Sequence, residues 1–136
     1  MKSAKSLIYI ACSLVLALTS MSAQTGGIRA KIPFDFHIGE QLLLAGDYKV
    51  TIEGTVLHVA RLDGSDFAFV PTYSYGHNKD TSPKLVFHRY GNHSYLAEAW
   101  MAASGHELWA SPGEVEYAQT TKQERTIVIA STLSNR

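Results

Sequence analysis

Residues 84–100 have the sequence KLVFHRYGNHSYLAEAW, in which two runs of apolar and aromatic residues flank the pair Gly91-Asn92. Glycine adopts positive φ without a steric penalty and asparagine tolerates it better than most residues, so this pair is typical of a two-residue hairpin turn. The stretch therefore predicts an antiparallel β-hairpin, in which side chains meet as cross-strand pairs. The expected register pairs Tyr90 with His93, His88 with Tyr95, and Phe87 with Leu96.

Shorter strand patterns lie on both sides of the hairpin. Tyr48, Val50 and Ile52 alternate with polar residues, which is the period-two pattern of a half-buried strand. Pro71 cannot donate to a strand ladder, so we expect it to end the fourth strand. The last strand, TIVIA, is apolar on both faces, which predicts burial on both sides. The predicted strands cover 31–38, 48–53, 55–62, 67–70, 84–90, 93–102 and 126–130.

Two polar segments, 72–83 and 104–109, show neither strand nor helix periodicity, so we expect irregular connections there. Loops that a rigid scaffold positions often carry function, and these two segments are the first candidates. The alternative for the first segment is a mobile connector whose tyrosines fold back on the sheet. The candidate functional surface consists of Tyr73, Tyr75, His77 and His106.

A helix is expected to begin near residue 111. Ser111 is suited to the N-cap, Pro112 to the first helical position, and Glu114 to the position that closes a capping box. Val115 and Ala118 share a face, but the segment holds few large apolar residues. The predicted helix is therefore short and shallowly docked.

Short strands joined by hairpin-length turns and followed by one late helix predict an all-β, mainly antiparallel fold. We expect either a six- to seven-stranded barrel or a compact sandwich, with one short C-terminal helix. No repeat or composition shift divides the chain, so residues 31–131 are expected to form a single β domain, followed by a tail over 132–136. Seven aromatic residues fill the core or, if the sheet closes into a barrel, line a ligand cavity: Phe34, Phe36, Phe67, Phe69, Phe87, Tyr95 and Trp100.

The N-terminus has the layout of a secretory signal peptide. Lys2 and Lys5 precede an apolar run over 7–18, and small or polar residues continue to Ala23. The run is shorter than the roughly 20 apolar residues of a transmembrane helix, although an uncleaved anchor is the alternative. We expect cleavage after Ala23, a flexible leader over 24–30, and a secreted or periplasmic mature chain.

Composition excludes several classes of function. Cys12 is the only cysteine and lies in the predicted signal peptide, so the mature chain would have no disulfide, no thiolate nucleophile and no cysteine-ligated metal. Of the 12 basic residues, loss of Lys2 and Lys5 leaves ten against 12 acidic ones. This balance does not favour nucleic acid, and it leaves the export signal as the only expected contact with a membrane.

Histidines on the hairpin raise the question of a metal site. His88 and His93 share a face, but a third ligand such as His37 or Asp35 would have to come from a neighbouring strand. No H-x-H or H-E-x-x-H spacing supports such a site, and no G-x-S-x-G elbow supports a serine nucleophile. We predict no catalytic, metal-binding or cofactor-binding residue and no cofactor.

Glu98 stands in an apolar strand on the same predicted face as Arg89, which lies opposite Ser94. A buried carboxylate needs a partner, so we expect Arg89 to satisfy either Glu98 or a backbone carbonyl at the sheet edge. This role is structural, because ion-pair networks perturb charge states without being active sites. The candidate structural network consists of His88, Arg89, Tyr90 and Glu98.

Three motifs recur in the order known from one family. IPFDF at 32–36, LLAGDYKV at 43–50 and KLVFHRYG at 84–91 resemble the I-P-F-x-F, L-P-A-G-x-Y-x-V and K-L-V-F-x-R-Y-G motifs of small exported bacterial β-rich proteins of unassigned function. The resemblance implies an exported β-rich domain and no particular activity. Leu44 replaces the usual proline, and residues 111–116 lack the basic residues often found where the family's C-terminal helix begins.

These observations predict an exported, non-enzymatic β domain that acts as an interaction or envelope-associated module. The expected partner is a protein or a small apolar ligand. A lipocalin-like carrier of a small apolar ligand is the alternative and requires an enclosed apolar cavity. A small hydrolase or metal-binding protein is the third possibility and requires a base and a nucleophile, or a set of ligands, in one cleft.

Overall fold

A computed structural model of the chain describes residues 27–77, 82–101 and 104–132, without the side chains of Tyr75 and His77. The predicted signal peptide lies outside these residues. Eleven strands and one helix follow one another in the described part: β1 (Gly27–Ile32), β2 (Phe36–Ile38), β3 (Gln41–Leu43), β4 (Gly46–Glu53), β5 (Val56–Arg61), β6 (Phe67–His77), β7 (Lys84–Tyr90), β8 (His93–Met101), β9 (Ser104–Leu108), α2 (Pro112–Thr120), β10 (Gln123–Ile129) and β11 (Ser131–Thr132).

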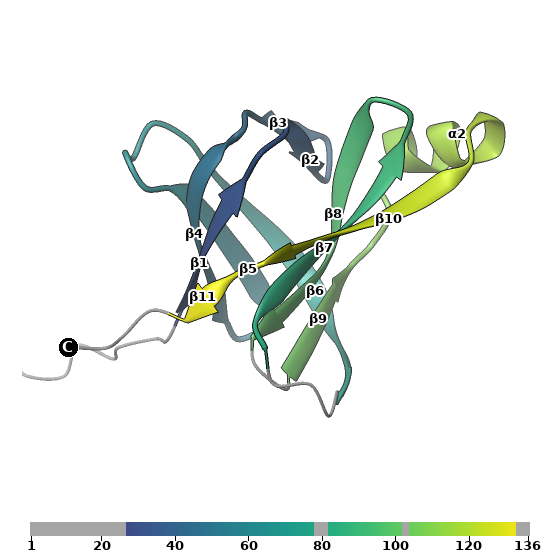
Figure 1. Cartoon of the computed structure of the whole chain (residues 1–136). Helices are drawn as coiled ribbons and strands as arrows, with labels where there is room; N and C mark the ends of the chain where they lie inside the picture. Colours follow the sequence, from purple (N-terminus) through teal and green to yellow (C-terminus); the bar gives the residue numbers. More distant parts are fainter. Residues whose placement is uncertain (1–26, 78–81, 102–103, 133–136) are drawn as a thin grey trace, which may run out of the picture.

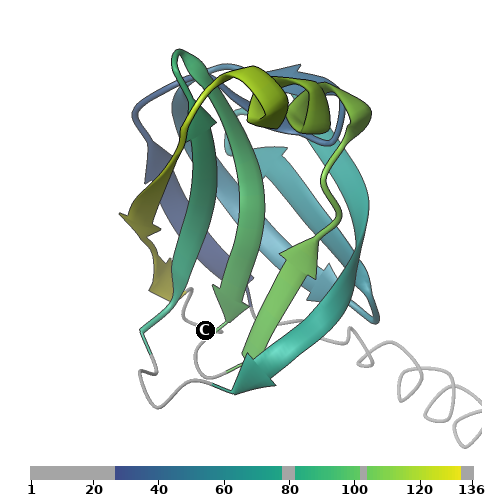
Figure 2. The same ribbon diagram turned by 90° about the vertical axis from the view of Figure 1, so that its right-hand side faces the viewer.

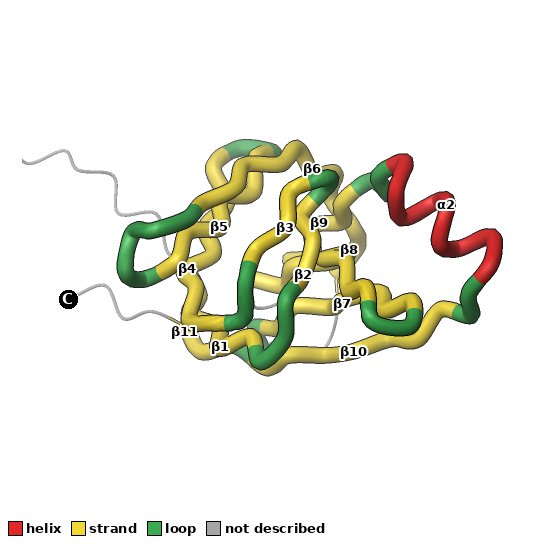
Figure 3. Tube along the Cα trace, turned by 90° about the horizontal axis from the view of Figure 1, so that it is seen from above, coloured by secondary structure: helices red, strands yellow, loops and turns green. Residues whose placement is uncertain are grey.

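The strands form one sheet with the order β10-β7-β8-β9-β6-β5-β4-β1-β11, bent so that two halves face each other (Figure 1). Strand β6 belongs to both halves, because its first part pairs with β5 and its second part pairs with β9. At the other side, β10 pairs with β7, and β11 pairs with β1. Only Ala130 separates β10 from β11 along the chain. The short hairpin β2-β3 lies between the halves at one end (Figure 3).

The all-β class and the single short C-terminal helix are confirmed. The sheet is not closed into a barrel, and it has more strands than the six or seven expected, because short and polar segments also pair. Within the described residues, no helix is both long enough and apolar enough to cross a membrane.

The hairpin predicted at 84–100 is formed by β7 and β8 with the predicted register: Tyr90 pairs with His93, His88 with Tyr95, and Phe87 with Leu96. A bulge between Val86 and Phe87 then shifts the pairing, so that Val86 lies opposite Glu98 and Ala97 is the extra residue. A bulge moves the residues beyond it to the other face of the strand. Glu98 therefore does not share a face with Arg89, as the sequence led us to expect.

Three predicted connections are strands instead. Pro71 does not end its strand, because β6 continues to His77. The proline stands at the last pair between β6 and β5, where the strand ladder does not need a backbone N–H donor. Residues 104–108 form β9, and residues 27–30, expected in a flexible leader, belong to β1 and pair with β4. The last strand is not buried on both faces, since Ile127 and Ile129 are exposed.

Aromatic rings fill the interior between the two halves. The ring of Phe36 makes edge-to-face contacts with Tyr48 of one half, at 5.2 Å between centroids, and with Phe87 of the other, at 5.5 Å. Phe34 also meets Phe87 edge to face, at 5.0 Å. Aliphatic residues of both halves surround these rings: Ile28, Ile32, Leu43, Val50, Leu57, Val59, Leu85, Leu96 and Leu108.

Helix α2 lies across the outer face of the β7-β8 hairpin (Figure 2). Its N-terminus is as predicted: the Ser111 side chain accepts a hydrogen bond from the backbone N–H of Glu114 at 3.2 Å, and Pro112 follows. The helix is short, and Glu114 is its only buried residue, while Val115 is exposed. The contact of α2 with the sheet thus depends mainly on polar and ring contacts and not on an apolar face.

Replacement of Gly91 by valine tests the role of the hairpin turn. Gly91 has φ of +61°, and a Cβ at this position would meet no atom within 4 Å, so the substitution adds backbone strain without a clash. We expect Gly91→Val to lower the free energy of unfolding by about 1–3 kcal/mol in urea denaturation. Gly91→Asn is the matched control and should cost clearly less, because asparagine tolerates positive φ. Equal stability of all three proteins would contradict the organising role of the turn.

Candidate functional site

A cleft of about 350 Å³ lies between the start of α2 and the outer face of β6, β7, β8 and β9. We call it the helix cleft. Aromatic, acidic and small residues line it: Tyr73, His88, Tyr90, Ala97, Glu107, Leu108, Trp109, Ala110, Glu114 and Gln123. The period-two geometry of β7 brings His88 and Tyr90 to this face, and the bulge in β8 adds the small side chain of Ala97.

Glu114 lines the helix cleft and is only 5% exposed. Its Oε1 accepts a hydrogen bond from the Tyr90 hydroxyl at 3.2 Å and lies 3.1 Å from Nδ1 of His88. The position of Glu114 in the first helical turn also favours a negative charge. Burial raises the pKa of Tyr90 to about 12, and the Glu114 carboxylate adds to the shift, so Tyr90 stays protonated and donates at neutral pH.

The predicted structural network is only partly formed. His88 and Tyr90 are joined, but by Glu114, a residue that the sequence assigned to a capping box. Arg89 donates from Nε to the Gly91 carbonyl at 2.9 Å, which is the backbone alternative we considered. Glu98 pairs instead with Arg125 of β10: the distance from Nη2 of Arg125 to Oε2 of Glu98 is 3.3 Å. Arg125 reaches Glu98 because the bulge has turned that side chain to the outer face.

The candidate functional surface is also divided. Tyr73 lines the helix cleft, where its ring lies 4.9 Å from the exposed ring of Trp109, a residue not singled out by the sequence. His106 does not line this cleft, and burial lowers the pKa of its imidazole. The side chains of Tyr75 and His77 lie outside the described residues.

A second group of rings lies around the tip of the hairpin. His37 stacks on Tyr95 at 4.6 Å between centroids, and His93 stacks on Tyr117 of α2 at 4.1 Å. The two imidazole rings, His37 and His93, are 6.3 Å apart. Within the described residues, no three histidine, aspartate or glutamate side chains are placed to hold a metal ion.

The outer face of β4, β5 and β6 carries a second hollow, of about 520 Å³. We call it the outer groove. Its lining is Lys49, Thr51, Glu53, His58, Val59, Ala60, Gly64, Asp66, Phe67 and Phe69. The strand register explains its shape: the small side chain of Ala60 stands between Phe67 and Lys49, and His58 stands between Phe69 and Thr51. A small residue between two large ones leaves a depression in the surface.

Phe67 and Phe69 are 57% and 59% exposed, although the sequence led us to expect them in the core or in an inner cavity. Their rings lie 5.3 Å apart, and His58 meets Phe69 edge to face at 4.5 Å. The residue of β6 that enters the core is instead Ala68. Two neighbouring phenylalanines that are more than half exposed form an apolar surface that water solvates poorly.

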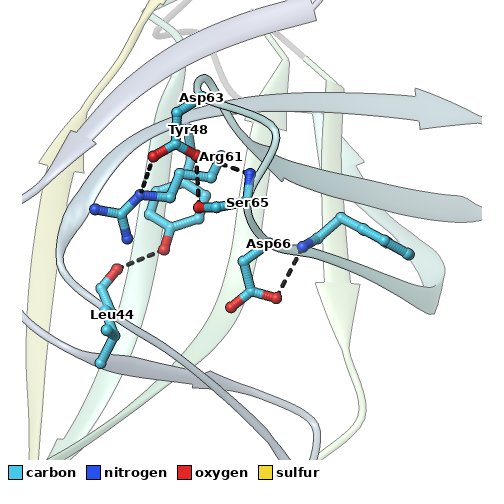
Figure 4. A network of polar contacts seen from close by, with 7 residues as sticks. Leu44, Tyr48, Arg61, Asp63, Ser65 and Asp66 are labelled. Atoms are coloured by element: carbon cyan, nitrogen blue, oxygen red, sulfur yellow. Dashed lines mark hydrogen bonds and ion pairs between the residues drawn. The ribbon is translucent and has the colours of Figure 1, made fainter.

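A polar network holds the turn from which Phe67 emerges (Figure 4). Ser65 donates to Asp63 from its backbone N at 2.8 Å and from its hydroxyl at 2.6 Å, and these bonds lower the pKa of the Asp63 carboxyl. Arg61 lies 3.3 Å from Asp63, and the Tyr48 hydroxyl donates to the Leu44 carbonyl. These contacts hold the conformation of the turn that precedes Phe67 at the edge of the outer groove.

Comparison of the chain with protein-family models, with curated proteins and with solved structures found no match. The resemblance based on the three sequence motifs stays a prediction. The function of the chain has to be inferred from the two hollows themselves.

The raised pKa of Tyr90 predicts a loss of stability at high pH. The fold favours the protonated phenol, so its contribution is present below the ordinary pKa of about 10 and is lost as the pH rises to about 12. Over this range we expect the stability advantage of the protein over its Tyr90→Phe variant to fall by about 2 kcal/mol in urea denaturation. Both proteins keep the other tyrosines, so parallel losses in the two would contradict the prediction.

Proposed function

We propose that the chain is an exported, non-enzymatic interaction module, and that it binds a partner protein through the outer groove. The observation that carries this proposal is the exposed pair Phe67 and Phe69 beside a hollow of about 520 Å³. Exposed aromatic residues gathered in one patch are typical of interaction sites, whereas single exposed apolar residues are not.

The shape and charge of the outer groove favour a segment of a protein as the occupant. The hollow lies on the outside of the sheet and is open to solvent, so it cannot engulf a small molecule. Lys49 stands on one side of the Phe pair, and Glu53 and Asp66 stand at the ends, which gives an apolar centre with a rim of both charges. Protein interfaces commonly combine an apolar core with such a polar rim.

The alternative of a lipocalin-like carrier has less support. A carrier needs an enclosed apolar cavity, but the rings of Phe36, Tyr48 and Phe87 meet in the centre of the fold. Both hollows described above lie on outer faces. The geometry offers no support for an inner ligand site among the described residues.

A hydrolase also has less support. The described histidines are spread over the outer groove, the helix cleft, the tip of the hairpin and strand β9. On β9, Nε2 of His106 lies 3.4 Å from the exposed Ser104 hydroxyl, which is longer than the usual separation of a nucleophile and its base, and neither residue lines the outer groove or the helix cleft. In the helix cleft, Nδ1 of His88 contacts Glu114, and no described serine or threonine hydroxyl bonds to the imidazole of His88. A base that has no nucleophile within hydrogen-bond reach does not favour acyl or phosphoryl transfer.

Photo-crosslinking in cells that export the protein tests the proposed surface. A photoreactive phenylalanine analogue in place of Phe69 is expected to give one discrete protein adduct on a denaturing gel. The same analogue in place of Ile129, an exposed apolar residue on the outer face of β10, is the matched control and should give little or none. Equal labelling from both positions would contradict a binding role for the outer groove.

The variant Phe67→Thr shows whether the adduct depends on the patch. Threonine keeps a high strand propensity, and Phe67 is mostly exposed, so the free energy of unfolding should change by no more than about 0.5 kcal/mol. The adduct formed from position 69 is nevertheless expected to disappear. An adduct that persists at full yield in this stable variant would show that the aromatic pair does not bind the partner.

A further inference from the structure

We infer that the helix cleft is a binding site for an organic ammonium ion, such as a free alkylamine or the side chain of a lysine. The proposal goes beyond the interaction function proposed above, because the helix cleft and the outer groove lie on the outer faces of different halves of the sheet.

The charge of the lining is the first argument. Glu107 and Glu114 both line the helix cleft, and the lining contains no lysine or arginine. Arg125, which lies opposite His88 on the neighbouring strand β10, is paired with Glu98. His88 contacts Glu114 but carries a charge only when it is protonated. Two carboxylates that share a partly buried cleft without a permanent cation favour a positively charged ligand.

The burial of Glu114 strengthens this argument. The side chain is 7% exposed, and both of its described hydrogen bonds are made by Oε1, from Tyr90 and His88. A buried carboxylate is expensive unless a positive charge compensates it. Tyr90 supplies only a neutral donor, since its pKa is raised to about 12. A bound ammonium group would supply the compensating charge.

The aromatic rings supply the second and independent argument. Trp109 is 60% exposed, and its indole lies 4.9 Å from the ring of Tyr73 at an angle of 45°. Both rings line the same cleft as the two carboxylates. Cations bind over aromatic faces, most strongly over tryptophan, and organic ammonium ions are recognised in this way. Rings and carboxylates together distinguish this cleft from a site for a metal ion or an anion.

The size of the cleft agrees with a small ligand. Its volume of about 350 Å³ is near the lower limit of known ligand pockets, which span about 300–1,000 Å³. Ala97 and Ala110 add small side chains to the lining and so take up little of the cleft. A trimethylammonium or primary ammonium group on a short carbon chain fits this space.

Titration of the full chain with choline, followed through the indole N–H signals in NMR spectra, tests the inference. We expect one indole signal to shift in a saturable manner, and this signal should be absent from the Trp109→Ala variant. Dimethylbutanol, the uncharged carbon isostere of choline, should shift it far less. Equal binding of the isostere, or no saturable shift with any cation, would overturn the inference.

Three variants and a second probe sharpen the test. Trp109→Ala and Glu107→Gln are each expected to weaken choline binding, measured by isothermal titration calorimetry, by about tenfold, because each removes one attractive contact. Phe69→Thr removes an aromatic ring from the outer groove and should leave choline binding unchanged. A tenfold loss of choline binding in Phe69→Thr, or no loss in Trp109→Ala and Glu107→Gln, would count against the site. Nα-acetyl-lysine amide, which keeps the side-chain ammonium group, separates the two sources of the ligand. Tighter binding than choline indicates a lysine side chain, and weaker binding indicates a free ammonium compound.

Discussion

The ring of Phe36 lies between one aromatic ring from each half of the sheet, and this contact determines what the interior can be. Phe36, Tyr48 and Phe87 are fully buried and meet edge to face. The only polar end among them, the Tyr48 hydroxyl, donates to the Leu44 carbonyl and needs no water or ligand. Because the hairpin β2-β3 places this ring at the centre, the bent sheet encloses a packed core, and the two hollows described above lie on the outer faces.

Much of the sheet could be predicted because its signals are local. The Gly91 turn fixes the register of the hairpin through positive φ, and the alternation at Tyr48 and Val50 correctly separates inside from outside. The bulge at Ala97 has no such local signal. It inserts one residue into an apolar run, and that one residue decided whether Glu98 would pair with Arg89 or with Arg125.

The candidate sites were harder to predict, since they depend on which face of each strand the bend of the sheet leaves outside. The alternation of β6 is Phe67, Ala68, Phe69, and hydrophobicity alone favours the phenylalanines for the core. The large rings of β2 and β4 already occupy the interior, so β6 contributes the small Ala68 and turns both phenylalanines outward. Glu114 was predicted at the start of the helix, but no local pattern indicates that His88 and Tyr90 lie beneath it.

The two hollows arise in the same way and differ in charge. In the outer groove the small residue is Ala60, which stands between larger neighbours on adjacent strands, and in the helix cleft it is the bulge residue Ala97. The outer groove has both signs of charge at its rim, whereas the helix cleft has only carboxylates and one histidine. Steering of partners follows the sign of the local field, so we expect the two proposed sites to select different occupants. Because the packed core separates the surfaces, an occupant of one proposed site would not obstruct the other.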